Sequence, residues 1–220
     1  MKKNNLGKYR LYGRNKIRSK KNLNLESYNN RLNKLKINSI DANKNNIMDI
    51  GSGNGESTIY LSKKYPKSNI DACENYINGN LNLINNIDKN NLKNIYLYNH
   101  NVSKLLDEIN KKKYFNLVWI FFPDPWPKKK HFKRRLINDE FLKKIYLLLK
   151  DESLVYIITD SKSYFRSIVL TIYQCRKKFT WINQNNLFLN YQDYLLPHTK
   201  YYKKAFNLGI KPNIIILKKI

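Results

Sequence analysis

The sequence predicts an α/β fold in which helices flank a mostly parallel central sheet. Short apolar runs typical of buried strands alternate with longer segments that have helical periodicity. A glycine-rich turn, Gly51–Gly55, joins the first such run to the first helical segment. Alternation of this kind is typical of a parallel sheet, because the chain must cross back over the sheet before the next parallel strand begins.

The predicted elements follow one another from residue 46 onward. Strands are assigned to short runs rich in aliphatic or aromatic residues, and residues 115–121 are apolar enough to be central in the sheet. Helices are assigned to longer segments, such as the amphipathic residues 135–149. The predicted strands are residues 47–50, 69–73, 94–98, 115–121, 154–159, 179–183 and 213–218. The predicted helices are residues 56–65, 76–87, 135–149 and 163–176.

Length and composition indicate one folded domain with a short extension. The chain has 220 residues, 42% of them hydrophobic, which is enough for a sizeable core. Residues 1–45 are basic, Asn-rich and weakly patterned, so we predict a partly flexible basic extension there. Residues 46–220 contain the predicted elements and form the folded domain.

The charge balance points to a polyanionic partner. The chain has 42 basic and 16 acidic residues, a net charge of +26, which favours nucleic-acid binding. Its abundance of Lys, Asn, Ile and Tyr is also typical of low-GC coding, which would place part of the Lys excess on solvated faces. Residues 1–21 interleave cations with Tyr9 and Tyr12, which fits an arm that meets phosphates and bases or a solubilising tail.

Several classes of protein are disfavoured. Cys73, Cys175 and three scattered His residues make neither a disulfide framework nor a zinc motif, so we expect no metal, reduced thiols and a cytoplasmic location. No apolar run approaches the roughly 18 residues that span a bilayer, so no membrane partner is expected. The basic N-terminus has no apolar segment typical of a secretory signal.

The glycine-rich turn is a candidate cofactor loop, because ligands in such sheets bind beyond the carboxyl ends of the strands. Gly51, Gly53 and Gly55 let the backbone turn tightly and a ligand approach closely. Glu74 ends the next predicted strand, where an acid can accept hydrogen bonds from two ribose hydroxyls. This pair of features fits any nucleoside-bearing cofactor, although an ordinary turn beside a solvated acid is the alternative.

Two further acids distinguish between cofactors. Glu56 stands where a dinucleotide-binding loop needs its third glycine, and its charge would repel a pyrophosphate. Asp49 adds another acid just before the loop. A cationic sulfonium ligand with an ammonium group tolerates these acids, so we predict an S-adenosylmethionine pocket. The residues assigned to it are Asp49, Gly51, Gly53, Gly55 and Glu74.

Asn101 follows the third strand and is a further candidate for the cofactor. Its amide both donates and accepts hydrogen bonds, so it could bind the edge of adenine. Polar residues also commonly cap the loops after strands, and that explanation stays open.

The segment after residue 121 combines an acid, an aromatic ring and many cations. Three prolines stiffen residues 122–127 around Asp124, and Trp126 offers a face on which a base can stack. A run of cations follows in residues 128–135. Phosphate contacts would supply affinity and base contacts selectivity, so the segment is a candidate RNA site. A stiff turn before a basic helix explains the prolines but not the density of cations.

The chain resembles the bacterial-type tRNA (guanine-N7-)-methyltransferase family. Gly51–Gly55 alone would indicate only a class I methyltransferase. The resemblance becomes specific through the segments Phe122–Arg135, Thr159-Asp160 and Pro197–Tyr201, and the basic arm Tyr9–Arg14 also matches. It covers most of the chain.

The resemblance implies a Rossmann-like class I methyltransferase fold. It implies methyl transfer from S-adenosylmethionine to N7 of a guanine in the tRNA variable loop, with a carboxylate at Asp124 as the catalytic group. It matches Asp49, Glu74 and Asn101 to cofactor contacts. The residues it matches to substrate contacts are Lys128, Asp160, Thr199, Lys200, Tyr201 and Tyr202.

The sequence departs from the family at three places. Asn101 replaces an aspartate, Tyr202 replaces a glutamate, and Lys204-Ala205 replace Arg-Gly. A catalytically weak RNA-binding protein that retains the fold is therefore the alternative function. A methyltransferase of exocyclic amines is disfavoured, because Asp124 separates Pro123 from Pro125. The sequence leaves both a monomer and a homodimer open.

Guanine N7 has a lone pair and no proton, so methylation needs no general base. Positioning would supply most of the acceleration. We expect Asp124 to stabilise the developing positive charge or to bind the guanine edge, with Asp160 as its companion.

Overall fold

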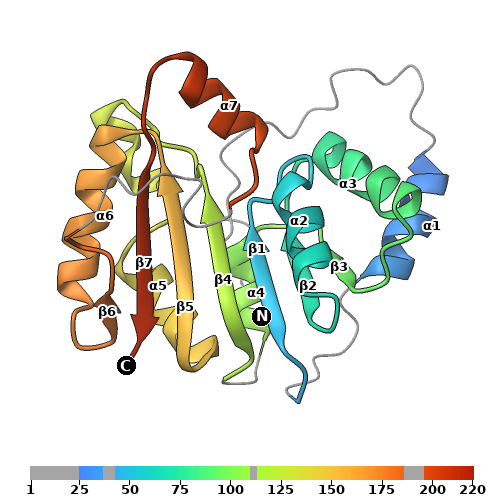
Figure 1. The fold of residues 1–220 in the computed structure, drawn as a ribbon, viewed down its shortest axis with the longest axis horizontal. Helices are drawn as coiled ribbons and strands as arrows, with labels where there is room; N and C mark the ends of the chain where they lie inside the picture. The colour runs from blue at the N-terminus through green and yellow to red at the C-terminus, as the bar shows by residue number, and fades with distance from the viewer. Residues whose placement is uncertain (1–24, 37–42, 110–112, 186–195) are drawn as a thin grey trace, which may run out of the picture.

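The computed structural model describes residues 25–36, 43–109, 113–185 and 196–220. Its core is a seven-stranded sheet of order β3-β2-β1-β4-β5-β7-β6 (Figure 1). The first five strands are parallel, and β7 runs antiparallel to both β5 and β6. The strands are β1 (Asn46–Ile50), β2 (Asn69–Cys73), β3 (Ile95–Tyr98), β4 (Phe115–Phe121), β5 (Leu149–Thr159), β6 (Phe179–Trp181) and β7 (Asn213–Lys219). The predicted α/β fold with a mostly parallel sheet is confirmed.

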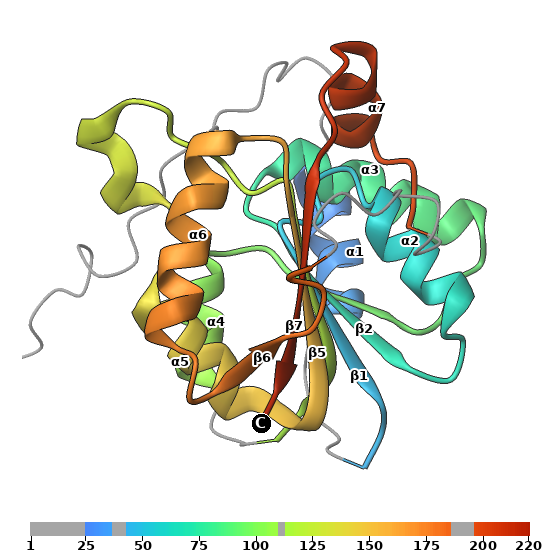
Figure 2. The same ribbon diagram turned by 60° about the vertical axis from the view of Figure 1, so that its left-hand side comes forward.

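Helices cover both faces of the sheet. Figure 2 shows α4, α5 and α6 on one side and α1, α2 and α3 on the other, and each set packs on its own apolar core. Helix α7 lies above the carboxyl ends of the parallel strands (Figure 1). The helices are α1 (Leu25–Leu35), α2 (Glu56–Lys64), α3 (Ile77–Lys89), α4 (Val102–Glu108), α5 (Asp139–Leu148), α6 (Lys162–Gln174) and α7 (Lys200–Asn207).

Two elements begin four residues or more away from their predicted starts. The helix expected from residue 135 begins at Asp139, because the Asn138 side chain accepts a hydrogen bond from the Phe141 amide and caps it there. The preceding cations form a 3₁₀ helix, Lys129–Arg134. Strand β5 begins at Leu149 rather than residue 154, since Leu149 already pairs with the start of β4.

Helix α1 lies in the weakly patterned extension, where no element was predicted. Its inward contacts come from Tyr28 and Leu32, both buried and one helical turn apart. Leu35 packs against the same core, so the apolar residues do recur at helical spacing, and this signal was missed among the surrounding Asn and Lys residues. Residues 1–24, including the basic arm Tyr9–Arg14, lie outside the described residues.

The strand order reverses between β1 and β4, which neighbour each other although β2 and β3 separate them in sequence. A reversal of this kind opens a crevice at the carboxyl edge of the sheet. The glycine loop after β1 and the Asp124 loop after β4 therefore leave the sheet side by side.

Candidate active site

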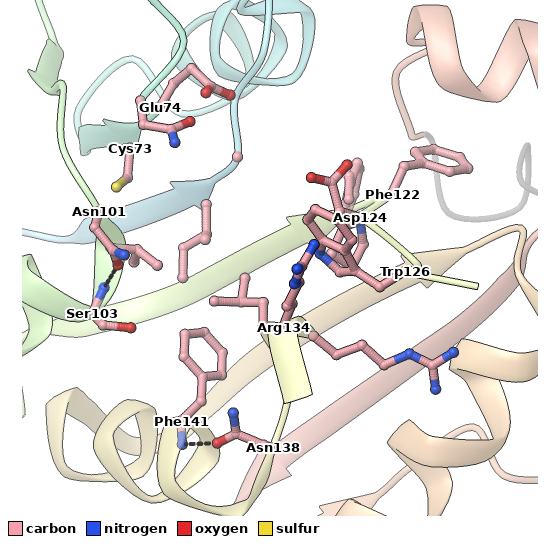
Figure 3. A pocket seen from close by; sticks show the side chains of 18 of the residues that line it. Cys73, Glu74, Asn101, Ser103, Phe122, Asp124, Trp126, Arg134, Asn138 and Phe141 are labelled. Carbon is pink, nitrogen blue, oxygen red and sulfur yellow. Dashed lines mark hydrogen bonds between the residues drawn. The ribbon is translucent and has the colours of Figure 1, made fainter. Parts of the chain in front are cut away.

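A cavity of about 600 Å³ lies at this reversal point. Figure 3 shows Cys73, Glu74 and Asn101 on one side of it and Phe122, Asp124 and Trp126 on the other. Helix α5 and the residues just before it contribute a further wall. The volume is within the range of small-molecule and cofactor sites.

The carboxylate of Glu74 is fixed against the glycine loop. Its Oε2 accepts a hydrogen bond from the Gly53 amide at 3.0 Å, and its Oε1 accepts one from the Tyr76 amide at 2.7 Å. The loop is also tied to β2, because the Gly51 amide donates to the Cys73 carbonyl oxygen at 2.8 Å. The acid and the loop therefore form one preorganised edge of the cavity.

The loop depends on Gly79, a glycine that is not among the predicted site residues. A Cβ on Gly79 of α3 would lie 2.5 Å from the Gly53 carbonyl oxygen and 3.4 Å from Glu74 Cγ, so only glycine lets α3 approach this closely. Gly55 is tight in the same way, since its Cβ would lie 2.4 Å from Leu83 Cδ1. A glycine inside a predicted helix was the available signal.

Asp49 lies beneath the loop and is not among the residues that line the cavity. It is 1% exposed, and its Oδ2 accepts hydrogen bonds from Ser57 Oγ at 2.6 Å and Thr58 Oγ1 at 2.7 Å. Burial raises the pKa of Asp49 to about 6, against the effect of these two hydroxyls. In this arrangement Asp49 fastens the start of α2 to β1.

Asn101 lines the cavity and also caps a helix. Its Oδ1 accepts the Ser103 amide at 2.8 Å at the start of α4, which is the capping role left open by the sequence. Cys73 is beside it, with its Sγ 3.6 Å from the His100 carbonyl oxygen. Burial raises the pKa of the Cys73 thiol well above its usual value, so this thiol is not a reactive thiolate.

The loop after β4 is held in an uncommon conformation. Phe122 and Trp126 have positive φ angles of 50° and 42°, which non-glycine residues seldom adopt. Asp124 is exposed between them, at the cavity. The Arg134 guanidinium lies over the Trp126 ring, 4.9 Å from its centroid. Strain of this kind persists only where surrounding contacts fix the backbone.

Arg135 supplies those contacts and corrects one expectation. It belongs to the cation run that is predicted to meet RNA, but it is 5% exposed. It donates to the Pro125 carbonyl oxygen at 2.9 Å and to Ser163 and Ser167 of α6. The more exposed cations of the run are Lys128, Lys129, Lys130 and Lys133.

Helix α7 brings the C-terminal motif to the cavity. The Thr199 side chain caps the helix through the Tyr202 amide at 3.2 Å. Tyr201 is 57% exposed, lines the cavity and stacks on Phe122 with ring centroids 6.1 Å apart. Tyr202 turns away and stacks on His198 at 5.0 Å.

The structure therefore divides the predicted site residues into two groups. The predicted residues that line the cavity are Gly51, Gly53, Glu74, Asn101, Asp124 and Tyr201. The predicted residues outside that lining are Asp49, Gly55, Lys128, Asp160, Thr199, Lys200 and Tyr202. Among the described residues, no group of three or more His, Cys, Asp or Glu side chains could hold a metal ion.

Residues 43–213 match the family model described as "Putative methyltransferase". The tRNA (guanine-N(7)-)-methyltransferase of Buchnera aphidicola subsp. Schizaphis graminum is 35% identical over 78% of this chain and 71% of its own length. The chain belongs to the tRNA (guanine-N7-)-methyltransferase family. The predicted family is thereby confirmed.

Other relatives of the family are larger. The bifunctional methyltransferase of Rickettsia conorii is 32% identical over 79% of this chain, which spans only 32% of that protein. Among solved structures, an rRNA methylase from Streptococcus thermophilus has a TM-score of 0.53 and 14% identity, over 92% of this chain and 99% of its own. That likeness confirms the class I methyltransferase fold. No helix in the described part of the chain is long and apolar enough to cross a membrane.

Proposed function

We propose that the chain transfers a methyl group from S-adenosylmethionine to N7 of a guanine in the variable loop of tRNA. The observation that carries this proposal is one cavity shared by two loops, with Glu74 on the glycine loop side and Asp124 on the other. The Buchnera relative is named for methyl transfer to guanine N7 of tRNA, which supports the choice of tRNA and of N7.

The glycine loop side fits the donor. Glu74 keeps its carboxylate at the cavity edge, where it can accept hydrogen bonds from ribose hydroxyls. Gly51 also lines the cavity, and a Cβ there would have no heavy atom within 4 Å. When bound, S-adenosylmethionine supplies an electrophilic methyl group on sulfur. Asn101 would contact the adenine of S-adenosylmethionine. Asp49 and Gly55 would contribute indirectly, by fixing the conformation of the glycine loop.

The Asp124 side fits the acceptor. The N7 lone pair of guanine forms a bond to the methyl carbon, while the carbon–sulfur bond breaks and its electrons stay on sulfur. The product guanine gains positive charge, which the exposed Asp124 carboxylate stabilises. Asp160 follows β5 at the same edge of the sheet and would assist Asp124.

Cations and α7 would hold the RNA around the reacting base. Lys128 and the exposed lysines after it would bind phosphates. Thr199 and Lys200 begin α7, whose Tyr201 offers a ring at the cavity for stacking, with Tyr202 behind it. We also propose that residues 1–45 form a basic N-terminal extension of the catalytic domain, residues 46–220, with α1 packed on that domain. We further propose that the enzyme works in the cytoplasm on tRNA.

The test is a transfer assay. The chain is incubated with S-adenosylmethionine labelled in its methyl group and unmodified tRNA, and the product is cleaved at N7-methylguanine. We expect cleavage at the variable-loop guanine and no label in a tRNA with adenine there. Asp124→Asn should lower transfer by about 100-fold and leave S-adenosylhomocysteine affinity unchanged. Tight tRNA binding without transfer would instead indicate an RNA-binding protein that has lost catalysis.

A further inference from the structure

The first turn of α7 lacks half of a common capping arrangement. In a capping box, a threonine N-cap accepts the amide three residues later, and a glutamate at that later position accepts the N-cap amide in return. Thr199 makes the first bond, but the residue three positions on is Tyr202, which has no carboxylate. The Thr199 amide instead donates to the Pro197 carbonyl oxygen at 2.8 Å.

A carboxylate reaches this helix end from elsewhere in the chain. The Lys200 amide, the first of α7, donates to Glu56 Oε2 at 2.6 Å. Glu56 is the first residue of α2 and follows Gly55 directly, so this bond joins the end of the glycine loop to the start of α7. A negative charge at a helix N-terminus is stabilising, because the helix dipole and the unbonded amides both favour it.

Helix α7 has a second attachment across the cavity. The Tyr201 ring stacks on Phe122 with an interplanar angle of 24°, and Phe122 begins the loop that carries Asp124. The same short helix therefore contacts the end of the glycine loop through Glu56 and the loop that carries Asp124 through Phe122. Tyr201 lines the cavity and is the second residue of α7, so its position follows that of the helix start.

We propose that Glu56 is a positioning residue for the tRNA side of the site. It holds the N-terminus of α7 on the glycine loop, so that Tyr201 stands at the cavity where the base enters. This inference rests on the proposed function, because tRNA is the ligand that Tyr201 would meet. The carboxylate acts through α7 and touches neither the donor nor the base.

The experiment compares Glu56→Ala, Glu56→Gln and the matched control Glu26→Ala. Glu26 is also an exposed acid in the first turn of a helix, but it belongs to α1. Hydrogen exchange of α7, the affinity for S-adenosylhomocysteine, and KM and kcat with tRNA are measured for each protein. The amide oxygen of Gln can still accept the Lys200 N–H, so Glu56→Gln should restore the part of the effect that comes from the hydrogen bond itself.

For Glu56→Ala we expect exchange in α7 to rise by about 10-fold, consistent with the loss of one hydrogen bond to a charged group. The KM for tRNA should rise by a similar factor, while S-adenosylhomocysteine affinity stays within about twofold of wild type. Glu56→Gln should lie between wild type and Glu56→Ala, because it keeps the hydrogen bond and loses the charge, and Glu26→Ala should resemble wild type.

Three results would overturn the proposal. One is unchanged exchange in α7 of Glu56→Ala, another is an equal loss of S-adenosylhomocysteine affinity, and the third is a Gln variant that behaves like the Ala variant. If wild type methylates no tRNA, the proposed function fails. The exchange measurement on the free protein still decides whether Glu56 holds α7.

Discussion

The guanidinium Nε of Arg135 donates a hydrogen bond to the carbonyl oxygen of Pro125 at 2.9 Å. The same side chain donates to the carbonyl and hydroxyl oxygens of Ser163 and to the hydroxyl of Ser167. It also packs on Phe132, 3.7 Å from the ring centroid. One buried arginine therefore ties the strained loop that carries Asp124 to helix α6.

Replacing Arg135 should release that loop. Lysine has one donor centre and cannot reach the acceptors that the planar guanidinium bonds together, so Arg135→Lys should lower the free energy of unfolding by about 2 kcal/mol. Methyl transfer should fall further than stability alone explains, because Asp124 loses its fixed backbone. Thermal melts and transfer rates at 25 °C measure both. Arg166→Lys, an exposed position on α6, is the matched control, and an equally large effect there would refute the argument.

The exposed cations after the Asp124 loop should act through RNA phosphates. Lys128→Ala combined with Lys129→Ala should weaken tRNA binding and reduce the slope of log affinity against log salt by about 1 to 2. Titrations at several salt concentrations give that slope. Lys67→Ala with Lys89→Ala removes the same charge at the opposite edge of the sheet, where α2 and α3 end. Equal slopes for the two double variants would show that net charge alone matters.

Gly79 should be essential for the conformation of the glycine loop, Gly51–Gly55, although Gly79 itself lies in helix α3. Alanine normally stabilises a helix interior relative to glycine by up to about 1 kcal/mol. Here the new Cβ would lie 2.5 Å from the Gly53 carbonyl oxygen, so the loop must shift. We expect Gly79→Ala to weaken S-adenosylhomocysteine binding by about 10-fold or more in calorimetry. Asn85 is also in α3, where its side chain accepts a hydrogen bond from Arg31 of α1. The control Asn85→Ala should bind S-adenosylhomocysteine normally.

Asp71 makes stability depend on pH in a defined direction. It is 2% exposed in β2, and burial raises its pKa to about 7, against a partial lowering by the Tyr114 hydroxyl. Because the folded pKa exceeds the unfolded value of about 3.9, the folded state binds the proton more tightly and stability falls as pH rises through this range. Asp71→Asn should therefore raise Tm at pH 8 by several degrees, and the gain should shrink by pH 5.

Melting curves of wild type and Asp71→Asn between pH 5 and pH 8 test this directly. Asp49, whose pKa is also raised, keeps part of the wild-type slope in the variant. A gain in Tm that is the same at both ends of the range would contradict ionisation as the cause.

The sequence by itself determined the fold class and the two loops that carry the chemistry. Strand and helix periods are local properties, so the alternation that predicts a parallel sheet can be read without any contact between distant residues. The glycine loop and the proline-stiffened Asp124 segment are also local, because backbone freedom and backbone stiffness belong to the residues themselves. The family motifs, such as Phe122–Arg135 and Pro197–Tyr201, are likewise short local stretches.

Only the tertiary structure decided which polar side chains form hydrogen bonds within the protein and which remain exposed. Arg135 and its neighbour Lys133 are both cations in one run, but one is buried against α6 and the other is exposed. Likewise Asp49 bonds to the hydroxyls of α2, and Glu56 bonds to a helix that begins 144 residues later. The sequence shows that a polar or charged side chain needs a hydrogen-bond partner if it is buried. Which group becomes that partner depends on which distant segment the fold places beside it.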